Sequence, residues 1–96
     1  MTAFFIGMTS IKDAEKFQDY AAKAAPTFAP FGGKLVIRGK AEQALAGEAN
    51  HQAVGIVSFP DMDALNNWYR SDAYQALIPL RNAAADMDLV AYSEPA

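Results

Sequence analysis

Both halves of the chain show the same succession of hydrophobic patterns, and few folds are built from two such halves. Each half begins with a short apolar run, continues with apolar residues spaced three and four apart, and ends with a second short run. Short runs predict strands, and the spacing predicts helices. The expected strands are 3–8, 34–38, 52–59 and 87–92, and the expected helical stretches are 11–28, 61–70 and 72–85. Two βαβ halves predict a ferredoxin-like α+β fold, βαββαβ, with a four-stranded antiparallel sheet.

Capping and helix-breaking residues set the expected ends of these elements. Each helical stretch has a candidate N-cap, whose side-chain oxygen can accept from a free N–H of the first turn. The candidates are Ser10 or Asp13, Asp61, and Ser71 or Asp72. Proline lacks an N–H, so Pro26 and Pro30 end the first helix or begin a new turn, and Pro79 kinks or restarts the last one. Residues 40–50 predict a connection with a short extended piece at 44–46.

The expected strands are apolar on both faces, although the chain has helices for only one. Alternation in the first strand places Phe4 and Ile6 on one side and Phe5 on the other, and the third strand is apolar on both sides. Monomers rarely expose large apolar patches. We therefore expect the second face to pack against another copy, which gives a homodimeric α+β barrel. The alternative is a short sheet whose surface tolerates exposed hydrophobic residues.

Composition narrows the classes of function. The 96 residues suit one domain, 1–96, and 52% of them are hydrophobic. The net charge is −3 and the eight basic residues are scattered, so we expect no nucleic-acid partner. The lack of cysteine excludes disulfides and thiolate metal sites. No apolar stretch approaches the roughly 18–20 residues of a membrane helix, and no basic signal-peptide region is present. We therefore expect a cytoplasmic protein that does not enter a membrane.

Three segments, FGGKLVIRG, SFPDMDALNNWYRSDAYQALIPLR and LVAYSE, carry a resemblance to a known family. The chain resembles the uncharacterised bacterial family named domain of unknown function thirteen-thirty over almost its whole length. The most specific positions are Gly32, Gly33, Arg38, Phe59, Pro60, Trp68, Tyr69, Ser71, Tyr74, Leu80 and Arg81. Family members usually read Arg-Gly-Gly where residues 38–40 read Arg-Gly-Lys, and often Ser-Pro-Glu-Tyr where residues 71–74 read Ser-Asp-Ala-Tyr.

The resemblance implies the dimeric α+β barrel superfamily, in which two ferredoxin-like sheets pack face to face. That superfamily includes cofactor-free monooxygenases of aromatic substrates, haem-degrading enzymes and lactone isomerases. The branch that this chain resembles has no established activity. What the resemblance implies is therefore a fold and an assembly, and it leaves the reaction open.

Aromatic residues and one arginine gather in the last helical region. Trp68, Tyr69 and Tyr74, together with Tyr20, form either core or the wall of a pocket, because each has an apolar body and a polar tip. Arg81 continues the apolar stripe of Tyr74 at helical spacing. A buried guanidinium needs a partner. The candidates are an anionic ligand or an internal carboxylate, namely Glu42, Glu48 or Asp86.

Arg38 and His51 are two further residues with side chains that could have a functional role. Arg38 ends the second strand, and alternation places it beside Lys34 and Val36, at the wet end of the sheet or the rim of a dimer. An intersubunit salt bridge is the simpler reading, and ligand binding is the alternative. His51 is the only histidine and lies in a polar connection, so we expect it at the solvated surface. Zinc would need several converging ligands, so we expect no metal, haem or other cofactor.

These features predict a small-molecule pocket between the sheet and the helices. The protein would be a cofactor-independent enzyme acting on a small aromatic or carboxylate compound. The alternative is a non-catalytic dimer that binds a metabolite or a protein. No catalytic residue is assigned, and the candidate ligand-binding residues are Arg81, Trp68, Tyr74, Tyr69, Arg38 and Tyr20.

Overall fold

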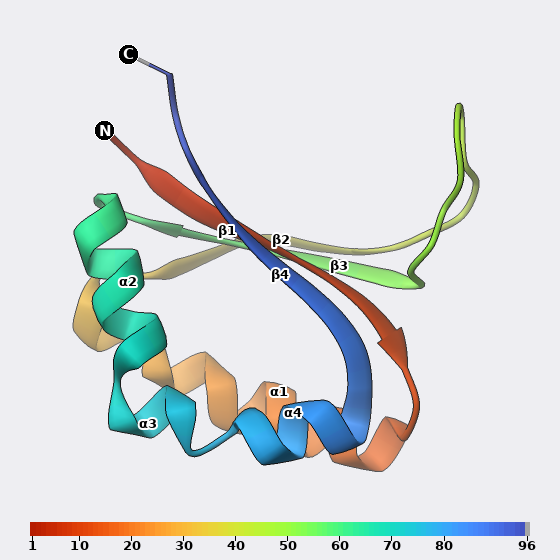
Figure 1. The fold of residues 1–96 in the computed structure, drawn as a ribbon, viewed down its shortest axis with the longest axis horizontal. Coiled ribbons are helices and arrows are strands. Elements are labelled where there is room, and N and C mark those ends of the chain that lie inside the picture. Colours follow the sequence, from red (N-terminus) through yellow and green to blue (C-terminus); the bar gives the residue numbers. More distant parts are fainter. Residues whose placement is uncertain (96) are drawn as a thin grey trace.

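The four strands form one antiparallel sheet in the order β2-β3-β1-β4, in a computed structural model that describes residues 1–95 (Figure 1). The central strands β1 and β3 therefore come from different halves of the chain. This order and the βαββαβ succession confirm the expected ferredoxin-like α+β fold. The strands are β1 (Ala3–Ile11), β2 (Lys34–Lys40), β3 (Ala53–Phe59) and β4 (Ala85–Ser93).

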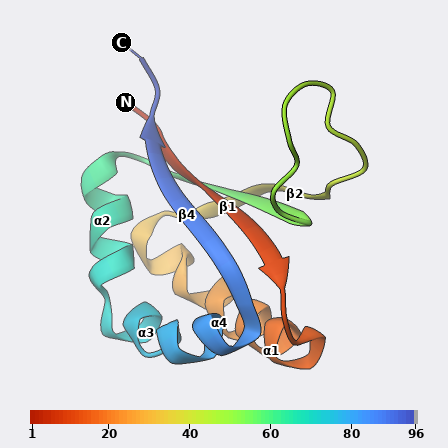
Figure 2. The ribbon, with the colours of Figure 1, turned by 45° about the vertical axis from the view of Figure 1, so that its right-hand side comes forward.

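All of the helices cover the same face of the sheet, as Figures 1 and 2 show from two directions. They are α1 (Ala14–Ala24), α2 (Met62–Arg70), α3 (Asp72–Gln75) and α4 (Ile78–Ala84), with the short 3₁₀ turns η1 (Ala25–Thr27) and η2 (Ala29–Phe31). We call the covered side of the sheet the helix face and the other side the open face. No helix within residues 1–95 is long and apolar enough to span a bilayer.

The core lies between the helix face and α2, and it is largely aromatic. Trp68 is 1% exposed and stacks on Phe5 of β1, with the ring centroids 5.0 Å apart. Its indole N–H donates to Thr27 Oγ1 at 2.9 Å, so the polar tip of this buried ring is satisfied. Tyr74 and Phe59 are the other fully buried large side chains. Trp68 and Tyr74 are therefore core residues.

The element ends differ from expectation mainly where strands pair. Residue Ile11 pairs with Ala85, so β1 and β4 each run past the expected ends and residues 86–88 form strand instead of a turn. Backbone pairing with a neighbour outweighs the local turn preference of the two aspartates. Asp13 caps α1 by accepting from the Lys16 N–H at 3.1 Å. The extended piece expected at 44–46 is wrong, because the β2–β3 connection has no strand there and bends at residues 45–47.

The proline predictions are confirmed. Pro26 and Pro30 each lie in the first turn of a short 3₁₀ helix, and Pro79 lies in the first turn of α4, after a break that follows α3. A proline in the first turn loses no intrahelical bond, because its missing N–H would have no partner there. The last helical region is therefore two helices with different axes, and the second axis decides where Arg81 points.

The turn before β2 requires both of its glycines. Gly32 has a φ of 74°, in the left-handed region that favours glycine. A Cβ on Gly33 would lie 2.6 Å from Cε2 of Phe59 and 2.9 Å from Cβ of Phe28. The Phe59 ring has no room to yield, because it is 2% exposed in the core.

We expect Gly33→Ala to lower the free energy of unfolding by about 1–3 kcal/mol, since the added methyl overpacks the core. Urea unfolding followed by tryptophan fluorescence measures this. Gly39→Ala is the matched control, because its Cβ would meet only Val54 Cγ1 at the ordinary distance of 3.4 Å. Equal stability of the two variants would contradict the steric explanation.

Candidate functional site

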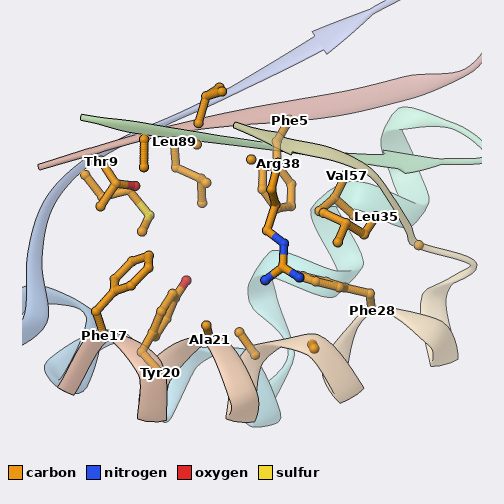
Figure 3. Close-up of a pocket in the computed structure, with 18 of the residues that line it drawn as sticks. Phe5, Thr9, Phe17, Tyr20, Ala21, Phe28, Leu35, Arg38, Val57 and Leu89 are labelled. Carbon is orange, nitrogen blue, oxygen red and sulfur yellow. The ribbon is translucent and has the colours of Figure 1, made fainter. Parts of the chain in front are cut away.

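A cavity of about 370 Å³ lies between the helix face and the α1–η1 segment (Figure 3). Small residues leave this space open on both sides. Gly7 and Gly55 pair with each other in the middle of the sheet, and alanines face them from α1 and η1. The wall side chains named in Figure 3 are Phe5, Thr9, Phe17, Tyr20, Ala21, Phe28, Leu35, Arg38, Val57 and Leu89. The wall of the cavity is therefore mostly apolar and has few polar groups.

Arg38 points into this cavity, and a β-bulge is the reason. Leu35 pairs with Val57 and Ile37 pairs with Ile56, so the register shifts by one residue between them. The extra residue reverses the alternation, so that Arg38 shares the helix face with Leu35. The expectation that Arg38 lies on one face with Lys34 and Val36 is therefore wrong. Figure 3 shows its guanidinium between the sheet and the α1 side chains.

Tyr20 supplies the second polar group of the cavity wall. Its hydroxyl lies 2.7 Å from the hydroxyl of Tyr74. Burial, followed by the neighbouring Tyr74, raises the pKa of Tyr20 well above its usual value, so the phenol stays protonated. Tyr20 therefore acts as a neutral hydrogen-bonding group on the cavity wall.

Arg81 stands behind the two tyrosines. Its Nη1 donates to Tyr74 Oη at 3.1 Å and to Tyr69 Oη at 3.5 Å. Burial alone would lower the pKa of Arg81, but the hydrogen bonds to these two phenols raise it above its usual value. The guanidinium is therefore a fixed positive charge at the end of the chain Arg81–Tyr74–Tyr20.

The structure thus divides the six sequence candidates into two groups. Tyr20 and Arg38 line the cavity, whereas Trp68, Tyr69, Tyr74 and Arg81 do not. The expected carboxylate partner of Arg81 is wrong for the described residues, because its bonds go to phenols. Sequence reasoning missed the glycine floor of the cavity. Glycine in a strand interior marks close approach or open space, and that signal was present at Gly7 and Gly55.

His51 is more tightly held than a solvated loop residue. Its Nδ1 lies 3.0 Å from Ser10 Oγ and its Nε2 lies 2.8 Å from Asp88 Oδ2. Its side chain is 18% exposed, so the expectation of a freely solvated ring is wrong. Within residues 1–95, no group of three or more histidines and carboxylates converges as a metal site would require.

The comparisons with known proteins agree on the fold. The model of a family described as "Domain of unknown function (DUF1330)" matches residues 2–94. A crystal structure of a protein of unknown function from Rhodopseudomonas palustris is similar, with 22% identity, a TM-score of 0.83, and coverage of 99% of this chain and 83% of that chain. No curated protein matches the sequence.

Two more distant structures have the same fold. One is SnoaB, a cofactor-independent oxygenase from Streptomyces nogalater, with 14% identity, a TM-score of 0.72, and coverage of 99% of this chain and 94% of that one. The other is a dimeric ferredoxin-like protein of unknown function from Jannaschia sp., with 12% identity, a TM-score of 0.74, and coverage of 98% and 100%.

Proposed function

The chain belongs to the DUF1330 family, and we propose that it is a homodimer whose protomers each bind a small aromatic or carboxylate compound between the sheet and the helices. The observation that carries the proposal is the guanidinium of Arg38, which is directed into a largely apolar cavity whose other polar side chains are Tyr20 and Thr9. The volume of about 370 Å³ is at the lower end of the usual range for small-molecule sites. We place the protein in the cytoplasm as part of the same proposal.

The chemistry of the wall selects the ligand class. Among the described lining residues, Arg38 alone is charged, and it lies on the exposed edge strand β2 with its guanidinium turned toward the apolar wall. A planar guanidinium pairs best with a carboxylate or another oxygen anion. The rest of the ligand must be apolar in order to gain from displacing water from the cavity. A carboxylic acid with one or two aromatic or aliphatic rings satisfies both requirements, an oxygen anion for Arg38 and an apolar body for the cavity.

We propose that the hydrogen-bond chain directs the Tyr20 proton toward the ligand. The Arg81 guanidinium only donates, so the Tyr74 oxygen accepts from it. Either hydroxyl can donate in the bond between Tyr74 and Tyr20, and the proposal assigns the donor role to Tyr74. The Tyr20 proton is then available to a ligand oxygen. The Arg81 cation at the far end of the chain polarises both phenols and strengthens the hydrogen bond from Tyr20 to the ligand. The arrangement stabilises negative charge on a ligand oxygen, as an oxyanion site does.

We propose that this stabilisation serves a cofactor-independent reaction. The described lining has no carboxylate or imidazole that could take a proton. Substrates must therefore enter already ionised, as carboxylates, phenolates or stabilised enolates. The shared fold of SnoaB, a cofactor-independent oxygenase, supports this reaction class. The same lack of a lining base favours the second candidate, a dimer that binds a metabolite without turnover, and product formation separates the two.

The open face supports the homodimer. Phe4, Ile6 and Met8 lie on it from β1, and Val54, Ile56, Ile37, Val90 and Tyr92 lie beside them in register. Val90 and Tyr92 are each 41% exposed and Ile37 is 58% exposed. A contiguous apolar patch on one face of a protein usually marks an interaction surface. The dimeric state of the similar Jannaschia protein supports the same assembly.

Arg38→Met should weaken the binding of 2-naphthoate by about tenfold to a hundredfold, because it removes a charge-assisted hydrogen bond worth about 1.5–3 kcal/mol. Ligand fluorescence titration measures the affinity. Tyr20→Phe should also weaken binding, since it removes the second donor. Binding of the neutral amide of the same acid should change less in both variants.

Lys34→Met is the control, because Lys34 lies on the same strand but pairs with Ser58 on the open face. Full affinity in that variant is expected. Unchanged naphthoate binding in Arg38→Met, or an equal loss in Lys34→Met, would contradict the proposed site.

A further inference from the structure

Ser10, His51 and Asp88 form a hydrogen-bonded series outside the cavity. Ser10 Oγ lies 3.0 Å from His51 Nδ1, and His51 Nε2 lies 2.8 Å from Asp88 Oδ2. The three residues come from β1, from the end of the β2–β3 connection and from β4. Ser10 follows Met8 on the open face, and it pairs with the charged residue Asp86 beyond the apolar patch. The series therefore lies at the polar end of that face.

The carboxylate fixes the protons of the series. An ionised carboxylate only accepts, so Nε2 of His51 carries the ring proton and donates it to Asp88. In the neutral ring, Nδ1 is then an acceptor, and the Ser10 hydroxyl donates to it. The carbonyl of Asn50 is a competing acceptor for this single proton, at the longer distance of 3.4 Å. A serine, a base and an orienting carboxylate are thus arranged as a nucleophile triad requires.

An open hollow lies beside the series. His51 and Asp88 line this hollow of about 360 Å³ together with Lys12 and Asn82. Ser10 is not part of its wall and adjoins it through the contact with His51. The backbone N–H of Ile11, next to Ser10 in the chain, donates to the exposed Gln52 side chain at 3.1 Å. A side-chain carbonyl is easily displaced, so a substrate oxygen can take its place at this N–H. The residue after the nucleophile is a common source of such a donor.

We propose that Ser10 is the nucleophile of a second, acyl-transfer site acting on small polar carboxylic esters, with His51 as general base and Asp88 as the residue that orients it. Ser10 Oγ attacks the ester carbonyl and its proton passes to His51 Nδ1. The C–O bond to the alcohol then breaks, and the alcohol leaves with that proton. Water, deprotonated by His51, attacks the acyl-serine, releases the acid and restores the hydroxyl. No oxidant, metal or cofactor enters the balance.

Fluorophosphonate labelling and the hydrolysis of 4-nitrophenyl acetate test the proposal on the intact protein. A fluorophosphonate should form one Ser10–O–P bond with loss of fluoride, and peptide mass spectrometry should place the adduct on Ser10. Ser10→Ala should abolish the adduct and the acyl-enzyme. His51→Gln should slow both reactions by about a hundredfold, the usual share of a general base. Asp88→Asn should slow them strongly as well, because an amide can donate to Nε2 and so favours the tautomer in which Nδ1 carries the proton and cannot act as the base.

Ser58→Ala is the matched control, because Ser58 also lies on the open face, opposite Phe4. Its labelling and hydrolysis should equal those of the unchanged protein. An adduct on another residue, or 4-nitrophenyl acetate hydrolysis that survives in Ser10→Ala, would overturn the proposal, since His51 would then act alone. A folded protein that takes no label at all would overturn it as well, with folding checked by circular dichroism.

Discussion

Replacing Trp68 with alanine is expected to lower the free energy of unfolding by about 3–5 kcal/mol, the usual cost of emptying the site of a large aromatic residue. Trp68 is 1% exposed and contacts Phe5, Phe28, Phe59 and Tyr74 through its ring. A domain of this size has a total stability of roughly 5–14 kcal/mol. The variant should therefore be unfolded in a large fraction of molecules at moderate temperature, and urea unfolding followed by circular dichroism measures the change.

Leu45→Ala is the control for this prediction, because Leu45 is 90% exposed in the β2–β3 connection. Its loss should change stability by no more than about 0.5 kcal/mol, as is usual for surface positions. Trp68→Phe should fall between the two, since it keeps an aromatic ring but leaves a cavity and removes the indole N–H that donates to Thr27 Oγ1. A stable Trp68→Ala variant would contradict the assignment of Trp68 to the core.

Placing a lysine on the open face, as Val90→Lys, is expected to convert the proposed homodimer into a monomer. Val90 lies opposite Ile6 in the middle of the apolar patch. A symmetric interface would bury two unpaired charges, and each costs about 3–5 kcal/mol. The dissociation constant should therefore rise by at least about a hundredfold. Light scattering after gel filtration should give twice the chain mass for the unchanged protein at micromolar concentration and the single-chain mass for the variant.

Gln18→Lys is the charge-matched control, because Gln18 is exposed on α1, on the far side of the protomer. It should remain dimeric. Val90 is 41% exposed in the protomer, so the lysine head can reach water and the fold should survive. Monomeric behaviour of the unchanged protein would contradict the role proposed for the open face. The prediction of ligand binding in the cavity would not be affected by that result.

Local sequence patterns were enough to predict the fold. Hydrophobic spacing placed the strands and helices, and proline positions located the helix breaks before α4 and at the two 3₁₀ turns. The caps at Asp13 and Asp61 also followed from sequence, because a cap depends on residues only three apart. The strand ends at Ile11 and Ala85 did not follow, because they depend on pairing between segments more than seventy residues apart.

The set of elements, their order and the apolar character of both sheet faces could be predicted from periodicity within single segments. The sites could not, because they depend on how distant segments pack. The bulge between Leu35 and Ile37 turned Arg38 into the cavity, and a register shift leaves no trace in hydrophobic alternation. The bonds joining Tyr20 to Tyr74, and His51 to Ser10 and Asp88, each link distant segments. Such contacts depend on how the strands and helices pack, and no local spacing encodes them.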